Sequence, residues 1–167
     1  NNVSEPWWHS TKALEHGKKA KDSHSGNGHI MSETVEKSLA EYASPIDNYV
    51  VSPTKFLVSN NTEVSFYARA HENAYYKEHF GLAVSTSGNS SANDFTMLQD
   101  WTITKQQGTS WNKYTVNLGA YAGQEIYVAI RHFFTSEEWA DQAKADEGHG
   151  VDALNIDDVL FTNVKMD

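Results

Sequence analysis

Two adjacent aspartates interrupt an apolar segment late in the sequence. Asp157 and Asp158 lie in a run of Leu, Ile and Val residues that ends at Phe161. Neighbouring side chains of a strand point to opposite faces, so strict alternation places Asp158 with Leu160 on one face and Asp157 with Phe161 on the other. A buried carboxylate without a partner is costly, so one of the two needs a partner inside or at the rim. In a solution that uses protein groups alone, Asp158 pairs with Arg131 and Asp157 accepts backbone N–H groups.

The sequence has eight histidines and no cysteine. Imidazole suits zinc, nickel and copper, but no pair of histidines shows the helical spacing, with an intervening glutamate, of a metalloprotease. The lack of cysteine excludes disulfides, thiolate-bound zinc, iron–sulfur clusters and cysteine nucleophiles. We expect the N-terminal histidines to lie in solvated loops, namely His9, His16, His24 and His29.

The sequence offers little that could catalyse a reaction. It contains no G-x-S-x-G nucleophile elbow and no glycine-rich phosphate loop. Carboxylate pairs for glycoside cleavage could be Glu72 with Glu78, or Glu137 with Glu138. We expect the first pair on a loop and the second at a helix start, where acidic residues favour the helix dipole. The sequence therefore predicts a protein that is not an enzyme.

Aromatic residues make up 12% of the chain, and several fall on predicted loops. Flat rings stack on sugar faces and on apolar patches of proteins, so they indicate binding without naming the ligand. The candidate ligand-binding residues are Tyr75 and Tyr76, which precede Glu78, and Trp139. A place in the core is the alternative for each ring.

Seven segments rich in Val, Ile, Tyr, Phe and Thr must position these residues. Turn-forming Ser-Pro, Ser-Asn-Asn, Ser-Gly-Asn and Gln-Gly sequences separate them. In one segment, alternation places His132 on the same face as Ile126 and Ile130. The pattern predicts an antiparallel β-sandwich with strands at residues 49–51, 64–70, 80–86, 95–103, 111–118, 126–134 and 154–163.

Two segments depart from this strand pattern. Residues 136–145 begin with a capping serine and two glutamates and continue with strong helix formers, so they predict a short helix in a loop. Residues 1–40 are polar and predict long loops with at most one helical turn. Residues 31–42 show helix-like spacing, which a short strand followed by a loop would also produce.

Length and charge limit the possible partners. The chain has 167 residues, the length of one domain, and a formal net charge of −9. Nucleic acid is excluded as a partner, because a phosphate backbone is held by clustered positive charge. From the length we expect a single domain, residues 1–167. No apolar run approaches the ~20 residues that span a bilayer, so we expect no membrane insertion.

Several segments follow one another in an order that is more specific than any segment alone. They are Trp7-Trp8, Ser23 to Gly26, and residues 45–53, 78–88, 94–98, 111–116, 118–124, 126–132 and 154–161. In this order they resemble the cleaved-adhesin family, the jelly-roll adhesin domains of gingipain proteases and haemagglutinins, related to choice-of-anchor modules. The resemblance implies an all-β fold, an antiparallel jelly-roll β-sandwich with a short helical loop insert. Residues 9–22 and 136–148 depart from the family, and such loop differences affect the ligand more than the fold.

The resemblance also implies bound calcium, because jelly-roll modules of this kind are similar in holding an ion near the sheet ends. Calcium takes about six to eight oxygen ligands. Asp47 follows a proline turn directly before a strand, and Asp157 is favoured over its neighbour. The candidate ligands are Asp47, Asn48, Glu78, Asp157 and Asp158.

We expect a non-catalytic adhesion or recognition module of a larger bacterial secreted or surface protein, placed outside the cell or on its surface. The expected partners are host or partner proteins or glycans, together with neighbouring domains of a larger chain. One alternative is a carbohydrate-binding module attached to a glycoside hydrolase, because the same architecture serves that role. The others are a structural spacer without a ligand and an enzyme that depends on Glu78.

Overall fold

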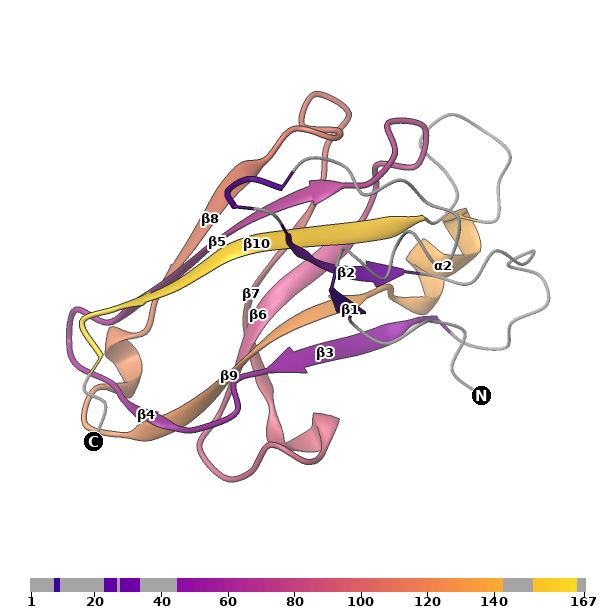
Figure 1. Cartoon of the computed structure of the whole chain (residues 1–167). Coiled ribbons are helices and arrows are strands. Elements are labelled where there is room, and N and C mark those ends of the chain that lie inside the picture. The colour runs from indigo at the N-terminus through magenta and orange to yellow at the C-terminus, as the bar shows by residue number, and fades with distance from the viewer. Residues whose placement is uncertain (1–7, 10–22, 27, 34–44, 143–151, 165–167) are drawn as a thin grey trace.

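Two antiparallel sheets pack face to face in this structure, a computed structural model that describes residues 8–9, 23–26, 28–33, 45–142 and 152–164 (Figure 1). One sheet has the strand order β1-β2-β10-β5-β8, and the other has the order β3-β9-β6-β7 with β4 paired to β9. The predicted all-β sandwich with a short helix is confirmed. The elements are β1 (Trp8–His9), β2 (Ile30–Glu33), β3 (Asp47–Val51), β4 (Phe56–Leu57), β5 (Glu63–Ala70), β6 (His79–Ser85), η2 (Ala92–Asp94), β7 (Thr96–Thr102), β8 (Asn112–Asn117), η3 (Gly119–Tyr121), β9 (Glu125–Phe133), α2 (Ser136–Gln142) and β10 (Ala153–Thr162).

The hydrophobic core lies between the two sheets. Phe66 of β5 and Ile156 of β10 face Phe80 and Leu82 of β6, and all four are completely buried. The rings of Phe66 and Phe80 meet edge to face with their centroids 6.1 Å apart. Burying one such side chain stabilises the fold by roughly 1.5–3 kcal/mol, so this contact holds the sheets together.

β9 is buried on its inner face and partly exposed on its outer face. It lies between β3 and β6, and Val128, Ala129 and Ile130 are each at most 4% exposed although they alternate between the faces. On the outer face only the small Ala129 is fully shielded, while Tyr127 and Phe133 stay partly exposed. As a result, β9 directs His132 toward the interior and Arg131 toward the outer face.

β10 contains a bulge at the aspartate pair. Between the pairs Asp157↔Tyr67 and Leu160↔Ser65, β10 advances three residues while β5 advances two. Asp158 takes up the extra residue with a φ of 49°, in the left-handed region.

The bulge changes which residues face the core. Leu160 is 54% exposed, whereas Phe161 packs against the core with its ring centroid 4.9 Å from that of Phe56. The strict alternation expected beyond Asp157 was therefore wrong, because one extra residue reverses the faces of all that follow.

The seven predicted strands are present, with ends that differ from the prediction by at most two residues. The short strands β1 and β4 were not predicted, whereas β2 agrees with the alternative of a short strand followed by a loop at residues 31–42. The expectation of loops for residues 1–40 is wrong at β1 and β2. β2 is held by its pairing with β10, in which Met31 lies opposite Asn155, so its own sequence carries little signal. The rest of that N-terminal segment, apart from residues 23–26 and 28–29, and the predicted helical residues 143–145 lie outside the described residues.

α2 begins at Ser136 as predicted and has seven residues. In the described part of the chain, no helix combines the length and apolar character that a membrane crossing requires.

Candidate functional site

A buried chain of polar side chains joins the two sheets near the starts of β3 and β6. Nδ2 of Asn48 donates to Oγ of Ser32 at 3.0 Å, and this oxygen lies 2.8 Å from Nδ1 of His132. Nε2 of His132 lies 2.8 Å from Oε2 of Glu78. All four residues are at most 9% exposed. Polar groups this deeply buried are stable only when they are hydrogen-bonded, so the network fixes β2, β3 and β9 relative to one another.

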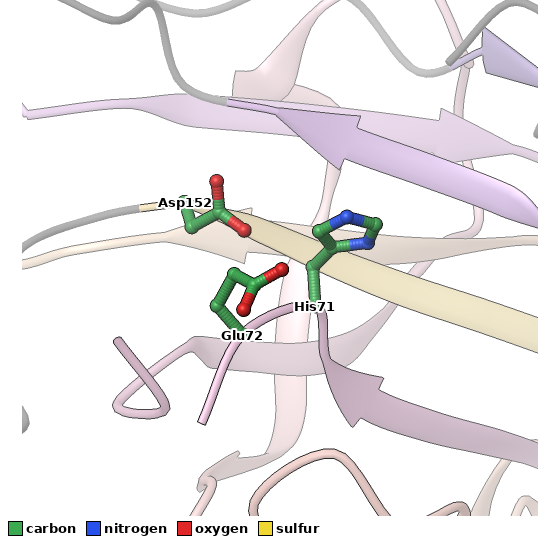
Figure 2. A group of neighbouring side chains, drawn as sticks. All are labelled: His71, Glu72 and Asp152. Atoms are coloured by element: carbon green, nitrogen blue, oxygen red, sulfur yellow. The ribbon is translucent and has the colours of Figure 1, made fainter. Parts of the chain in front are cut away.

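A second polar group lies beside this network, where β5 ends and β10 begins (Figure 2). The backbone N–H of Asp152 donates to Oε1 of Glu78 at 3.4 Å, and that of His71 donates to the carbonyl of Ala153 at 2.9 Å. His71, Glu72 and Asp152 each offer one ligand atom, and these atoms lie within 4.8 Å of one another. Among the residues that the structure describes, this is the one group of three or more acidic or histidine side chains with the spacing of a metal site.

Asp47 is held by Arg131 on the outer face of the second sheet. Nε and Nη2 of Arg131 lie 2.6 and 2.9 Å from the two carboxylate oxygens of Asp47, a bidentate ion pair. The guanidinium also lies over the rings of Phe133 and Tyr49. Burial lowers the pKa of Arg131, but the hydrogen bond and charge of Asp47 outweigh it and raise the pKa above its ordinary value. The pairing of Arg131 with Asp158, which the protein-only alternative predicted, is therefore wrong.

Asp157 and Asp158 bind a different segment, residues 23–26. Oδ2 of Asp157 accepts the backbone N–H groups of His24 and Ser25 at 2.8 and 3.1 Å, and its Oδ1 accepts that of Asp158 at 2.8 Å. Asp158 binds the hydroxyl of Ser25 and lies 2.6 Å from Nδ1 of His24. These hydrogen bonds, first that of Ser25 and then that of His24, lower the pKa of Asp158 below 3.8. Asp157 thus has the backbone partners that the protein-only alternative predicted.

The N-terminal histidines differ from the expectation of solvated loops. His29 is 4% exposed and packs edge-on against Trp111. His24 is exposed, but its ring stacks on Tyr67 with centroids 3.5 Å apart. His9 and His16 lie outside the residues whose side chains are described.

His79 fastens α2 to the sandwich. Its Nδ1 lies 2.8 Å from Oε2 of Glu138 in α2, and its Nε2 lies 2.6 Å from Oδ2 of Asp100 in β7. Glu138 also accepts the backbone N–H of Thr135 at 2.8 Å, while Thr135 Oγ1 accepts the backbone N–H of Glu138 at 3.1 Å. This reciprocal capping box starts the helix at the predicted place.

The three aromatic candidates have different surroundings. Tyr75 is 45% exposed, Tyr76 is partly buried against the core, and Trp139 is 7% exposed with its ring beside Phe134. Of these rings, Tyr75 is the one that presents a large surface to a ligand. Trp139 instead packs the inner side of α2 against the sandwich.

An open pocket of about 590 Å³ lies next to α2. Glu137, Glu138 and Asp141 supply three carboxylates to its lining, against the single ammonium group of Lys77. Lys77 lies 3.9 Å from Asp141 and offsets part of this negative charge. The pocket is therefore suited to a cationic group. Its lining consists of Lys77, Thr102, Phe134, Glu137, Glu138, Ala140 and Asp141.

Comparison with known proteins shows where this fold occurs. The cleaved adhesin domain family matches the chain over residues 5–146, which is most of its length. The chain belongs to the cleaved adhesin family.

Relatives of this cleaved adhesin domain include two large proteins of Porphyromonas gingivalis. The chain is 34% identical to Hemagglutinin A over 125 residues, which cover 66% of the chain and 6% of the relative. It is 31% identical to Gingipain R1 over 126 residues, which cover 68% of the chain and 7% of the relative. The chain thus spans a small part of the length of the proteins it matches.

Solved structures agree with the family. The K3 cleaved adhesin domain of Lys-gingipain from Porphyromonas gingivalis superposes with a TM-score of 0.64 at 25% identity, covering 87% of this chain and 79% of that one. The carbohydrate-binding module TmCBM61, in complex with beta-1,4-galactotriose, gives a TM-score of 0.50 at 14% identity, covering 96% and 89%. The second likeness shows the fold alone.

In this cleaved adhesin domain, the five predicted calcium ligands are divided among three places. Asn48 and Glu78 share the buried network, Asp47 lies with Arg131, and Asp157 with Asp158 lies at the bulge of β10. In the structure, each of the four carboxylates and the amide of Asn48 thus has a partner within the protein.

Sequence reasoning did not select His132, His71 and Asp152, which lie in or beside the buried polar network. For His132 the signal was present, since alternation placed it on the inner face. His71 and Asp152 carried no such signal, because they lie 81 positions apart and each is next to a strand end. Their proximity follows from the pairing of Ala70 with Leu154.

Proposed function

We propose that this chain is a non-catalytic adhesion module of a larger bacterial protein and that it binds partner proteins outside the cell or at its surface. The observation that carries the proposal is membership of the cleaved adhesin family over residues 5–146. Relatives named as a hemagglutinin and as gingipains support it.

The contact surface that we propose is the acidic pocket beside α2. Glu138 and Asp141 already contact His79 and Lys77, so Glu137 is the carboxylate that we propose to bind a lysine or arginine side chain of a protein partner. Opposite charges steer association as well as fix register. The helix that supplies Glu137 falls in the segment that departs from the family pattern, where specificity is expected to change. The loop that precedes Glu78 supplies Lys77 and also carries the exposed Tyr75.

Surface plasmon resonance on immobilised host matrix and plasma proteins tests this proposal. We expect micromolar or tighter binding to at least one protein, weakened tenfold or more by Glu137→Lys. Glu63→Lys is the matched control, because Glu63 is exposed and lies at the start of β5, outside the pocket. Lack of binding to every protein, or an equal loss in both variants, would refute the proposal.

A carbohydrate-binding module is the second candidate, favoured by the exposed ring of Tyr75. A glycan array separates the two, because a sugar-binding module binds there and loses its signal with Tyr75→Ala. Lack of a signal on both surfaces would leave the structural spacer as the explanation.

We also propose that calcium stabilises the module. The proposed ligands remain Asp47, Asn48 and Glu78 at this end of the sandwich. Asp47 lies with Arg131 on the outer face while Asn48 and Glu78 lie in the buried network, so a single ion would use only part of this set. Asp157 and Asp158 lie within β10, so we propose them as the less preferred pair.

A further inference from the structure

The end of β5 and the start of β10 bring three metal-ligating side chains together. His71 and Glu72 directly follow β5, and Asp152 directly precedes β10. The backbone N–H of His71 donates to the carbonyl oxygen of Ala153 at 2.9 Å, and this hydrogen bond holds the two chain segments side by side. Figure 2 shows the carboxyl groups of Glu72 and Asp152 next to each other, with the ring of His71 beside them. The three ligand atoms lie within 4.8 Å of one another, which a small shift of side chains would turn into a coordination shell.

Burial and charge favour a cation at this place. His71 and Asp152 are 3% and 9% exposed, and Glu72 is exposed, so the group is open to solvent on one side. Two carboxylates this close repel each other in a partly buried site. A divalent cation between them would cancel both charges at once.

A neighbouring side chain points to a metal independently. Asn155 is completely buried, and its Oδ1 has no hydrogen-bond partner among the described residues. Its amide nitrogen lies 3.4 Å from Nδ1 of His71. A histidine that binds a metal through one ring nitrogen usually donates its other N–H to a carbonyl or carboxylate oxygen. Turning the amide of Asn155 by 180° would place its oxygen beside Nδ1 of His71 as that acceptor, and we assign Nε2 as the ligand nitrogen.

The donor set selects the kind of metal. Calcium takes oxygen ligands, about six to eight of them, and an imidazole nitrogen is a poor substitute. One imidazole and two carboxylates suit zinc and its neighbours among the first-row transition metals, with a water in the fourth position. We propose that His71, Glu72 and Asp152 bind a divalent transition-metal ion, represented by Zn²⁺, with Asn155 as the positioning residue. A bound ion would hold the end of β5 next to the start of β10. The proposal does not depend on which partner the module binds.

Calorimetric titration of the untagged, chelator-treated protein with Zn²⁺ tests the site. We expect wild-type binding that weakens tenfold or more in Glu72→Gln, the exposed ligand whose replacement leaves the core intact. His24→Asn is the matched control, because His24 also contacts a carboxylate but lies at the bulge, and we expect its affinity to equal that of the wild type. A thermal unfolding series should show a rise of roughly 5 °C at a hundredfold excess of Zn²⁺ over Kd, lost in Glu72→Gln.

Three outcomes would overturn the proposal. In the Zn²⁺ titration they are no binding by the wild type, equal affinity in the wild type and Glu72→Gln, and a loss in His24→Asn as large as that in Glu72→Gln; the Ca²⁺ titration adds a fourth. A parallel titration with Ca²⁺ tests the choice of metal, since calcium binding with the same dependence on Glu72 would refute a transition-metal site. Asn155→Leu keeps the volume similar, and we expect it to weaken Zn²⁺ binding while far-UV circular dichroism stays unchanged.

Discussion

Buried polar side chains in this sandwich obtain their partners from distant parts of the chain. His132 and Glu78 are 54 positions apart, and their side-chain atoms meet at 2.8 Å with at most 1% exposure. Removing one partner leaves a buried polar atom of the other without its hydrogen bond, which typically costs about 1–3 kcal/mol. The pair therefore fixes how β9 approaches the chain just before β6.

At the same scale, we predict that Asp158 makes the free energy of unfolding depend on pH in the acid range. Its pKa is lowered in the folded state by Ser25 and His24, so its contribution is present above the ordinary value of 3.8 and is lost as pH falls through the lower folded value. Asp158→Asn, which tolerates the left-handed backbone, should remove this dependence. Urea unfolding of both proteins across the acid range measures it. An equal difference in stability at every pH would contradict the prediction.

At the scale of elements, the bulge of β10 decides which side chains reach the core. Because β10 gains one residue relative to β5, the residues beyond Asp157 point to the opposite faces from those that strict alternation predicts. The bulge also turns Asp158 outward, where it binds residues 24 and 25. One local feature thus sets both the packing of the strand end and the contacts of the aspartate pair.

We predict that the bulge reverses the ranking of two alanine variants. Leu160→Ala should change the free energy of unfolding by less than about 0.5 kcal/mol, because Leu160 is 54% exposed. Phe161→Ala should cost about 2 kcal/mol, because its ring packs against Phe56 in the core. Denaturant unfolding measures both. A larger loss for Leu160→Ala would favour continuous alternation.

A second prediction at this scale concerns how α2 is anchored. Trp139→Ala should cost about 3 kcal/mol, because Trp139 is 7% exposed beside Phe134. Tyr75→Ala should leave stability within about 0.5 kcal/mol of the wild type, because that ring is 45% exposed. Thermal and urea unfolding of both variants separate structural from contact rings. Equal losses would contradict these roles.

At the scale of the whole molecule, a net charge of −9 means that carboxylates repel one another on average across the fold. Ion pairs such as Asp47 with Arg131 offset part of this repulsion. Bound cations would offset more of it, and they would do so by binding the folded state alone.

We predict that calcium raises the melting temperature of the module. Treatment with EDTA should lower it by several degrees, and excess calcium should restore it. Asp47→Asn should abolish this calcium-dependent shift, while Glu63→Gln, an exposed control at the start of β5, should retain it. An unchanged melting curve together with no ion in elemental analysis would show that calcium is not bound.

Local pattern in the sequence determined most of the fold. Strands such as β5 and β9 were predicted nearly to their ends, because alternation and turn residues are local signals that depend on few neighbours. The order of the segments also determined the family, which the comparison then showed. The acidic first turn similarly placed the start of α2 at Ser136, although the side chain that caps the helix is that of Thr135 and not that of the serine.

Only the tertiary structure decided which polar groups meet. The strand β2 exists through its pairing with β10, and the bulge at Asp158 moves Phe161 rather than Leu160 into the core. Asp47 was expected among calcium ligands and forms an ion pair with Arg131, while His71 and Asp152 were joined by strand register. Such contacts depend on residues far apart in the chain, and a single sequence carries no local signal for a distance that register and bulges set.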